Sequence, residues 1–138
     1  MDRVLLMGGV AVLVAALVAG GRLVARRRLA WLRGRPADVL WAALGALPDG
    51  RPTVVAFSTP SCTSCRAAQK PALAALEARA GGRVRVVQVD AAERPEAATA
   101  FGVLTVPATV VLDGRGAVLA ANQGFASAER LAAQLGLS

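Results

Sequence analysis

The chain has 138 residues, enough for one domain and an additional segment, and 55% of them are hydrophobic, which excludes an intrinsically disordered chain. The formal net charge is +7, but residues 1–36 hold seven arginines against one aspartate. Residues 37–138 carry nine basic and eight acidic side chains and are nearly neutral. This distribution argues against a nucleic-acid-binding surface on the main domain, so we expect no nucleic-acid partner.

The first predicted element is a membrane-spanning helix within residues 1–25. Val4–Gly21 is uncharged and as a helix measures about 27 Å, enough for the hydrocarbon core of a bilayer. Residues 23–25 extend the span if the Arg22 side chain reaches out to the headgroups. A cleaved signal peptide is the competing interpretation, but it needs a basic start and a polar cleavage region with small residues. The sequence therefore favours an uncleaved anchor in contact with membrane lipid.

The arginines around this span predict its orientation. One arginine, Arg3, precedes the span. Six arginines follow it closely: Arg22, Arg26, Arg27, Arg28, Arg33 and Arg35. Because the positively charged flank of a span usually faces the cytoplasm, we expect a single-pass protein with its N-terminus outside and its domain inside. An outward-facing domain stays open as the alternative.

Residues 26–50 are expected to form a basic juxtamembrane segment and a short helix. The helix is predicted over Asp38–Leu47, and Pro48-Asp49-Gly50 ends it. Trp41, Leu44 and Leu47 recur at helical spacing, which predicts that all three lie in a core.

From residue 51 to residue 138, β-prone and helix-prone stretches alternate. The predicted strands are Thr53–Ser58, Val84–Asp90, Ala108–Leu112 and Ala117–Ala121, and the predicted helices are Cys62–Ala80, Glu93–Phe101 and Ser127–Leu135. The first two strands, joined by a helix, should be parallel, whereas the last two should form a hairpin. The pattern predicts an α/β domain with a mixed sheet and helices on both faces.

The two cysteines, Cys62 and Cys65, are the only ones in the chain, and they lie between the first strand and the following helix. Unpaired N–H groups and the helix dipole at that position stabilise a thiolate, the species that attacks a disulfide. A metal site needs more ligands, and without histidine it would have to be shared between chains. A purely structural disulfide would close too short a loop to stabilise much. The spacing favours a redox-active dithiol that needs no metal and no other cofactor.

Residues 51–138 resemble the thioredoxin family. The resemblance rests on the strand before the C-x-x-C, on Asp90 at the end of the next strand, on Phe101-Gly102 followed by Val103-Leu104-Thr105-Val106-Pro107, on Asp113-Gly114 and on Gly124. It implies a thioredoxin-like fold in which Cys62 is the attacking thiol and Cys65 the resolving thiol. It also implies that a cis Pro107 shapes the substrate groove and that Val106 offers its backbone to an extended polypeptide. Thr63 and Ser64, between the cysteines, are expected to contact the substrate and can donate hydrogen bonds to sulfur.

The sequence departs from the family pattern at three places. Ser61-Cys62-Thr63-Ser64-Cys65 replaces Trp-Cys-Gly-Pro-Cys. Ala56 and Val86 stand where the family has a buried aspartate and its lysine partner. Losing both charges together is physically coherent, because one buried charge without its partner is costly. Finally, Pro71 lies one residue later in the long helix than is usual.

These features predict a membrane-tethered thiol–disulfide oxidoreductase that reduces protein disulfides and serves cell redox homeostasis. Its partners would be a protein substrate and a separate electron donor or acceptor protein. One alternative is an outward-facing relative that acts in cytochrome c maturation or in extracytoplasmic disulfide reduction. Another is a non-catalytic binding module that holds a partner at the membrane.

Overall fold

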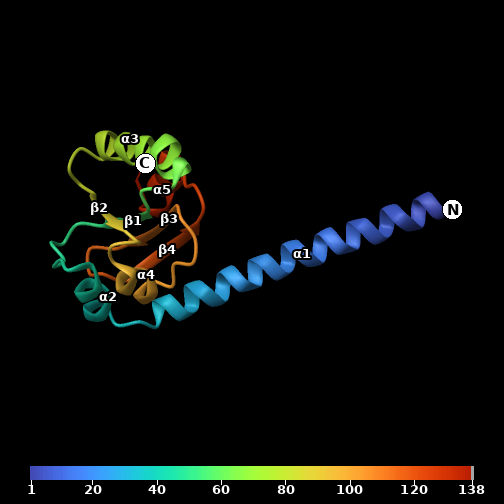
Figure 1. Ribbon diagram of the computed structural model, residues 1–138, viewed down its shortest axis with the longest axis horizontal. Coiled ribbons are helices and arrows are strands. Elements are labelled where there is room, and N and C mark those ends of the chain that lie inside the picture. The colour runs from blue at the N-terminus through green and yellow to red at the C-terminus, as the bar shows by residue number, and fades with distance from the viewer. Residues whose placement is uncertain (138) are drawn as a thin grey trace.

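The structure is a computed structural model and describes residues 1–137 (Figure 1). Its helices are α1 (Asp2–Arg33), α2 (Ala37–Leu44), α3 (Lys70–Ala80), α4 (Pro95–Ala100) and α5 (Ala128–Gln134). A π-helical turn, η1 (Cys65–Gln69), precedes α3 directly. The strands are β1 (Thr53–Ser58), β2 (Arg85–Asp90), β3 (Ala108–Leu112) and β4 (Val118–Gln123).

The four strands form one mixed sheet in the order β2-β1-β3-β4. β1 is parallel to β2 and antiparallel to β3, and β3 forms an antiparallel hairpin with β4. Both the parallel first pair and the final hairpin were predicted, and both are confirmed. The strand order places β1, which leads to the cysteines, in the interior of the sheet.

Alternating side chains of β1 divide the core into two layers, one on each face of the sheet. Val55 and Phe57 pack with α2 and α4, whereas Val54 and Ala56 pack with α3 and α5. Figure 1 shows the two helical layers on opposite sides of the strands. Since both faces of β1 are covered, its whole length reads as a hydrophobic run, as a buried strand should.

The short helix α2 ends earlier than the sequence suggested. Trp41 and Leu44 are buried as predicted, but Leu47 is 83% exposed, so its assignment to the core was wrong. The reason is Gly45, which adopts a left-handed φ of 67° and ends the helix three residues before the predicted boundary. Helical periodicity no longer applies to Leu47 once the helix has ended.

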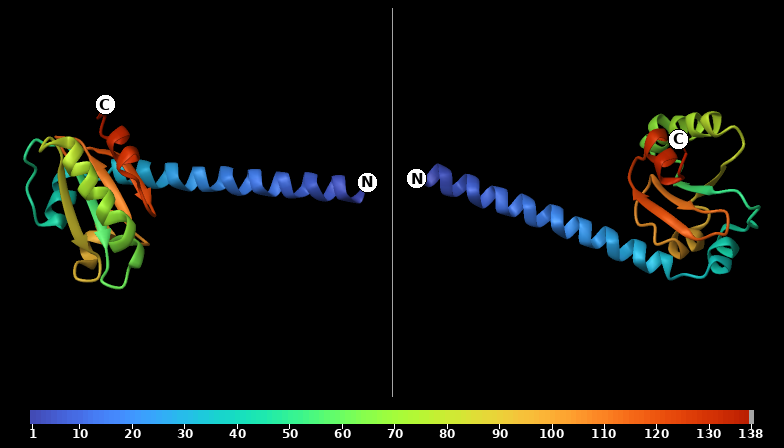
Figure 2. Two further views of the ribbon diagram at one scale, coloured as in Figure 1. Left: turned by 90° about the horizontal axis from the view of Figure 1, so that it is seen from above. Right: turned by 180° about the vertical axis from the view of Figure 1, so that it is seen from behind.

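The helix α1 is continuous over 32 residues, and its last turns pack against the domain. Leu32 is 2% exposed and belongs to the same core as Phe57. Arg33 donates hydrogen bonds from Nε to the Val118 carbonyl at 3.3 Å and from Nη2 to the Leu119 carbonyl at 3.0 Å. The rest of α1 leaves the domain as a single rod (Figure 2). The helix α1 and the domain are therefore joined without a flexible linker.

Within the described residues, α1 is the one helix that is long and apolar enough to cross a bilayer. The apolar stretch of α1 is fully exposed, so no part of the domain covers it. Burial in a protein core thus does not account for the apolar run.

Replacing Leu32 with alanine should lower the free energy of unfolding by about 2–3 kcal/mol, because the change leaves a cavity in the core. The matched control is Leu23→Ala on the same helix, where the side chain is 52% exposed and little change is expected. Urea unfolding of the full chain in mild detergent measures both variants. Equal stabilities of the two variants would contradict the docking of α1.

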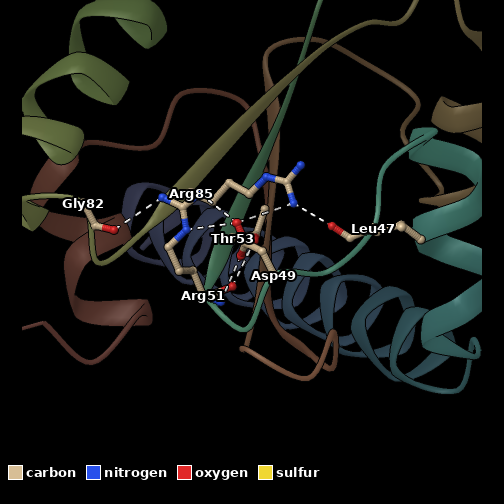
Figure 3. Close-up of polar contacts among 6 residues, drawn as sticks. All are labelled: Leu47, Asp49, Arg51, Thr53, Gly82 and Arg85. Atoms are coloured by element: carbon tan, nitrogen blue, oxygen red, sulfur yellow. Dashed lines mark hydrogen bonds and ion pairs between the residues drawn. The ribbon is translucent and has the colours of Figure 1, made fainter.

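Polar contacts hold the end of the sheet that lies farthest from the cysteines (Figure 3). Arg51 forms an ion pair with Asp49 at 2.7 Å, and Arg85 donates to the Leu47 carbonyl at 2.7 Å. The hydrogen bonds from Arg51 hold the pKa of Asp49 below its usual value. The contribution of this pair is present at neutral pH and is lost as the pH falls, and it is small because both groups are exposed. These contacts tie the loop before β1 to the start of β2.

Candidate active site

The cysteine pair lies just beyond the carboxyl end of β1. Cys62 and Cys65 form a disulfide, and their Cα atoms are 5.3 Å apart. A turn over residues 59–61 separates them from β1, and it is closed by the Cys62 N–H, which donates to the Thr59 carbonyl at 3.1 Å. The helical segment begins at Thr63, one residue later than predicted, so Cys62 precedes its first turn.

The two sulfur atoms have different surroundings. Cys65 is 5% exposed and faces the core, whereas Cys62 keeps part of its surface accessible. The Cys65 N–H donates to Cys62 Sγ at 3.2 Å. A backbone N–H aimed at this sulfur stabilises a thiolate on Cys62.

Iodoacetamide should therefore modify Cys62 before Cys65 when the reduced protein is treated below neutral pH. Both exposure and the N–H contact favour Cys62, so we expect at least tenfold selectivity. Peptide mass spectrometry after short reaction times reads out the labelled position. A preference for Cys65 would show that the two thiols have the opposite reactivity.

The helix that follows the cysteines is not a regular α-helix at its start. The predicted Cys62–Ala80 helix contains the π-helical turn η1, which ends just ahead of α3 and Pro71. A π-helical turn accommodates one more residue than the α-helical turn it replaces. The turn lies just before Pro71, which has no N–H to donate to the preceding turn.

The residues expected to bind substrate lie at the same end of the sheet as the cysteines. Phe57 pairs with Ala108, so Pro107 lies at the same end of the sheet as the carboxyl end of β1, which leads to Cys62. The Val106–Pro107 peptide bond is cis, and the Gly124 N–H donates to the Pro107 carbonyl at 2.9 Å. Val106 stays partly exposed.

The residues between the cysteines, Thr63 and Ser64, occupy the first helical positions with exposed side chains. Within residues 1–137, neither hydroxyl donates a hydrogen bond to sulfur, and Cys62 Sγ accepts from the backbone instead. Their position beside both sulfur atoms leaves them accessible to a bound substrate.

A cavity of about 120 Å³ lies beside Cys65 and Ala56, the position at which the sequence departs from the thioredoxin pattern. Ala56, Gln69 and Gln88 contribute to its lining. Ala56 pairs with Gln88 across β1 and β2, while Val86 pairs with Val54. Two exposed cations, Arg66 and Lys70, also line the cavity. The space near the buried sulfur thus holds amides and cations in place of a carboxylate.

Gln69, a buried polar side chain one helical turn after Cys65, was not among the site residues predicted from the sequence. Gln69 is 3% exposed, and its amide pairs with the backbone of Ala126 through two hydrogen bonds of 3.0 Å. This pair fixes the loop that follows β4 against the cysteine-bearing helix. The sequence contained one signal for this role. Gln69 lies four residues before Leu73, on the same face of the helix, and Leu73 is a core residue.

The described part of the chain has no group of three or more histidine, cysteine, aspartate or glutamate side chains that could hold a metal ion.

Comparison with known proteins agrees with this geometry. The thioredoxin family model matches residues 46–136. Chloroplastic thioredoxin z is 22% identical with a TM-score of 0.60, and the match covers 72% of this chain and 86% of that one. Thioredoxin from Fasciola hepatica is 26% identical with a TM-score of 0.54, over 63% of this chain and 80% of that one. MTB dsbF, solved in mixed oxidized and reduced forms, is 22% identical with a TM-score of 0.53 and the same coverage.

Two independent observations now agree, namely a family match over about two thirds of the chain and a disulfide between Cys62 and Cys65 at the end of β1. Thioredoxins act on protein disulfides through such a pair without a further cofactor. The chain belongs to the thioredoxin family and is a thiol–disulfide oxidoreductase.

Proposed function

We propose that this protein is a membrane-tethered reductase of protein disulfides. The observation that carries the proposal is the asymmetric cysteine pair, in which the accessible Cys62 accepts an N–H and Cys65 is buried beside it. The exposed apolar helix α1 supports the tether. Its arginine-rich flank favours a domain on the cytoplasmic side, where the reducing environment favours net reduction of substrates.

The reaction consists of two thiol–disulfide exchanges. The Cys62 thiolate attacks one sulfur of the substrate disulfide, forms a mixed disulfide and releases the first substrate thiolate. Cys65 then loses its proton and attacks Cys62 Sγ, which releases the second substrate thiolate and forms the Cys62–Cys65 disulfide. Two electrons have passed to the substrate, and a separate dithiol protein must restore the reduced pair. Val106, Pro107, Thr63 and Ser64 surround the position of the substrate strand in this proposal.

Reduction of insulin by the full chain in detergent, with dithiothreitol as electron source, tests the redox activity. Wild-type chain should accelerate insulin precipitation, and Cys62→Ser should bring the rate to background. Ser61→Ala, a small change at the neighbouring exposed residue, is the matched control and should retain activity. An inactive wild-type chain would favour a binding module without catalysis.

A fusion of alkaline phosphatase to the C-terminus tests the orientation in a bacterial host. Alkaline phosphatase is active only in the oxidising periplasm, so we expect this fusion to be inactive. A second fusion, with a reporter that is active in the cytoplasm in place of the phosphatase, should be active. An active phosphatase would place the domain outside and favour the extracytoplasmic alternatives.

A further inference from the structure

All the residues of the active site lie at one end of the sheet, the end at which β1 finishes and β3 begins. Phe57 pairs with Ala108, and Ala108 pairs with Gln123, so these three residues lie level across β1, β3 and β4. The cysteines follow β1 beyond this end, and Pro107 precedes β3 there. We call this end of the sheet, which Phe57, Ala108 and Gln123 define, the site edge.

The helix α1 runs along β4 and approaches the site edge as it is followed back toward its N-terminus. Arg33 contacts the carbonyl of Leu119, near the start of β4. Ala25 and Arg28 line a cavity together with Gln123, at the other end of β4. The eight residues of α1 from Arg33 back to Ala25 measure about 12 Å, and the four residues of β4 from Leu119 to Gln123 measure about 13 Å. The two segments therefore run side by side over the same length.

The end of the apolar span at Gly21 therefore lies about one helical turn from the level of the site edge. Ala25 is four residues after Gly21, which corresponds to about 6 Å of helix. The headgroup layer on each side of a bilayer is roughly 5–8 Å thick. Figures 1 and 2 agree with this direction, because the green start of the helical segment formed by η1 and α3 lies nearer to the N-terminus of α1 than the end of that segment does.

The loops at the site edge have the chemistry of a surface that meets a bilayer. Leu104, in the loop before Pro107, is 75% exposed, and Phe125, next to Gly124, is 49% exposed. Arg130 is exposed and shares the cavity with Arg28 and Gln123. Exposed apolar side chains and arginines at the same end of a domain favour an interface with anionic headgroups.

We propose that the packing of α1 on β4 turns the active site toward the bilayer, and that the substrate is a disulfide of a membrane protein held at the membrane surface. This inference rests on the proposed function and specifies its substrate class. Electrons pass by the same two exchanges, from the Cys62–Cys65 dithiol to the substrate disulfide. Disulfides far above the bilayer should be poor substrates, because α1 has no flexible joint that would let the site turn away from the membrane.

The orientation is tested without using the redox activity. Cysteine is introduced by Leu104→Cys at the site edge or by Arg115→Cys in the β3–β4 turn at the opposite end, in a chain that also carries Cys62→Ser and Cys65→Ser. Each full chain is labelled with a fluorophore and reconstituted in vesicles of phosphatidylcholine and phosphatidylglycerol that contain a headgroup-linked quencher. We expect quenching at position 104 to exceed quenching at position 115 at least threefold. Equal quenching, or stronger quenching at 115, would overturn the proposal.

The substrate class is tested with two transmembrane peptides in the same vesicles. One carries a disulfide-linked reporter at the bilayer surface, and the other carries it above a twelve-residue helical spacer, about 18 Å farther out. Wild-type chain should reduce the surface disulfide at least tenfold faster. An insertion of eight Gly/Ser residues between Gly21 and Arg22 leaves the α1–β4 contacts intact and should bring the two rates within twofold of each other.

The outcomes separate the inference from the proposed function. Equal rates on the two peptides by a wild-type chain that reduces insulin would overturn the substrate class and leave the reductase standing. A chain that floats with vesicles but reduces neither insulin nor peptide would refute the reductase and the substrate class together. The quenching pair then reports on the orientation alone.

Discussion

A Cys65→Ser variant should accumulate as a mixed disulfide with its substrate, and its steady-state rate should fall by on the order of a thousandfold. Cys62 remains accessible in this variant and keeps the N–H contact from residue 65, so the first exchange proceeds. The serine hydroxyl that replaces the buried thiol cannot displace the substrate from Cys62. The 5.3 Å between the two Cα atoms places the natural thiol within bonding reach of Cys62, so we expect the wild-type chain to release substrate.

Non-reducing electrophoresis followed by mass spectrometry detects the trapped species and identifies the natural substrate in membranes. The matched control is Cys62→Ser, which lacks the attacking thiol and should trap nothing. Accumulation of mixed disulfide in Cys62→Ser instead would assign the attacking role to Cys65.

An Ala56→Asp variant should release substrate from the mixed disulfide about a hundredfold faster near neutral pH, the lower range of general-base contributions. The cavity of about 120 Å³ beside Ala56 and Cys65 has room for the carboxylate. Once ionised, the carboxylate can accept the proton of Cys65, which in the wild-type chain must reach water. Burial should raise the pKa of the new aspartate above its usual value, because the two cations that line the cavity, Arg66 and Lys70, are exposed and their charges are screened by water.

The matched control is Ala56→Asn, which has nearly the same shape and no charge. Stopped-flow measurement of substrate release should show the acceleration in the aspartate variant alone, and equal gains in both would rule out proton transfer. The raised pKa also has a signature in stability. The aspartate variant should lose stability relative to the asparagine variant as the pH rises from the ordinary aspartate pKa to the raised one, and should be equally stable in acid.

The sheet could be predicted because its signals are local. β1 and β3 have the predicted boundaries, since each is a short apolar run bounded by proline, glycine or charged residues. The strand-to-helix position of the cysteines likewise followed from their immediate neighbours. Leu47 shows the limit of periodicity, because a single left-handed glycine ended the helix on which the prediction depended.

The remaining features depend on contacts between distant segments. Leu32 belongs by sequence to a basic flank, and only its packing against the core shows that α1 is fixed to the domain. Gln69 looks like an ordinary polar residue of a helix until its partner, Ala126, is known. The π-helical turn η1 was not predicted, because the backbone there depends on how the helix formed by η1 and α3 fits on the sheet.

The rigid connection between α1 and the domain has a consequence for a span inserted as proposed. A span that is longer than the local hydrocarbon thickness tilts to keep its apolar residues covered. Because the last turns of α1 are fixed to β4, the whole domain must rotate by the same angle. Bilayer thickness would thereby set the angle at which the cysteines meet their target, and lipid composition could tune the rate of disulfide exchange without any ligand.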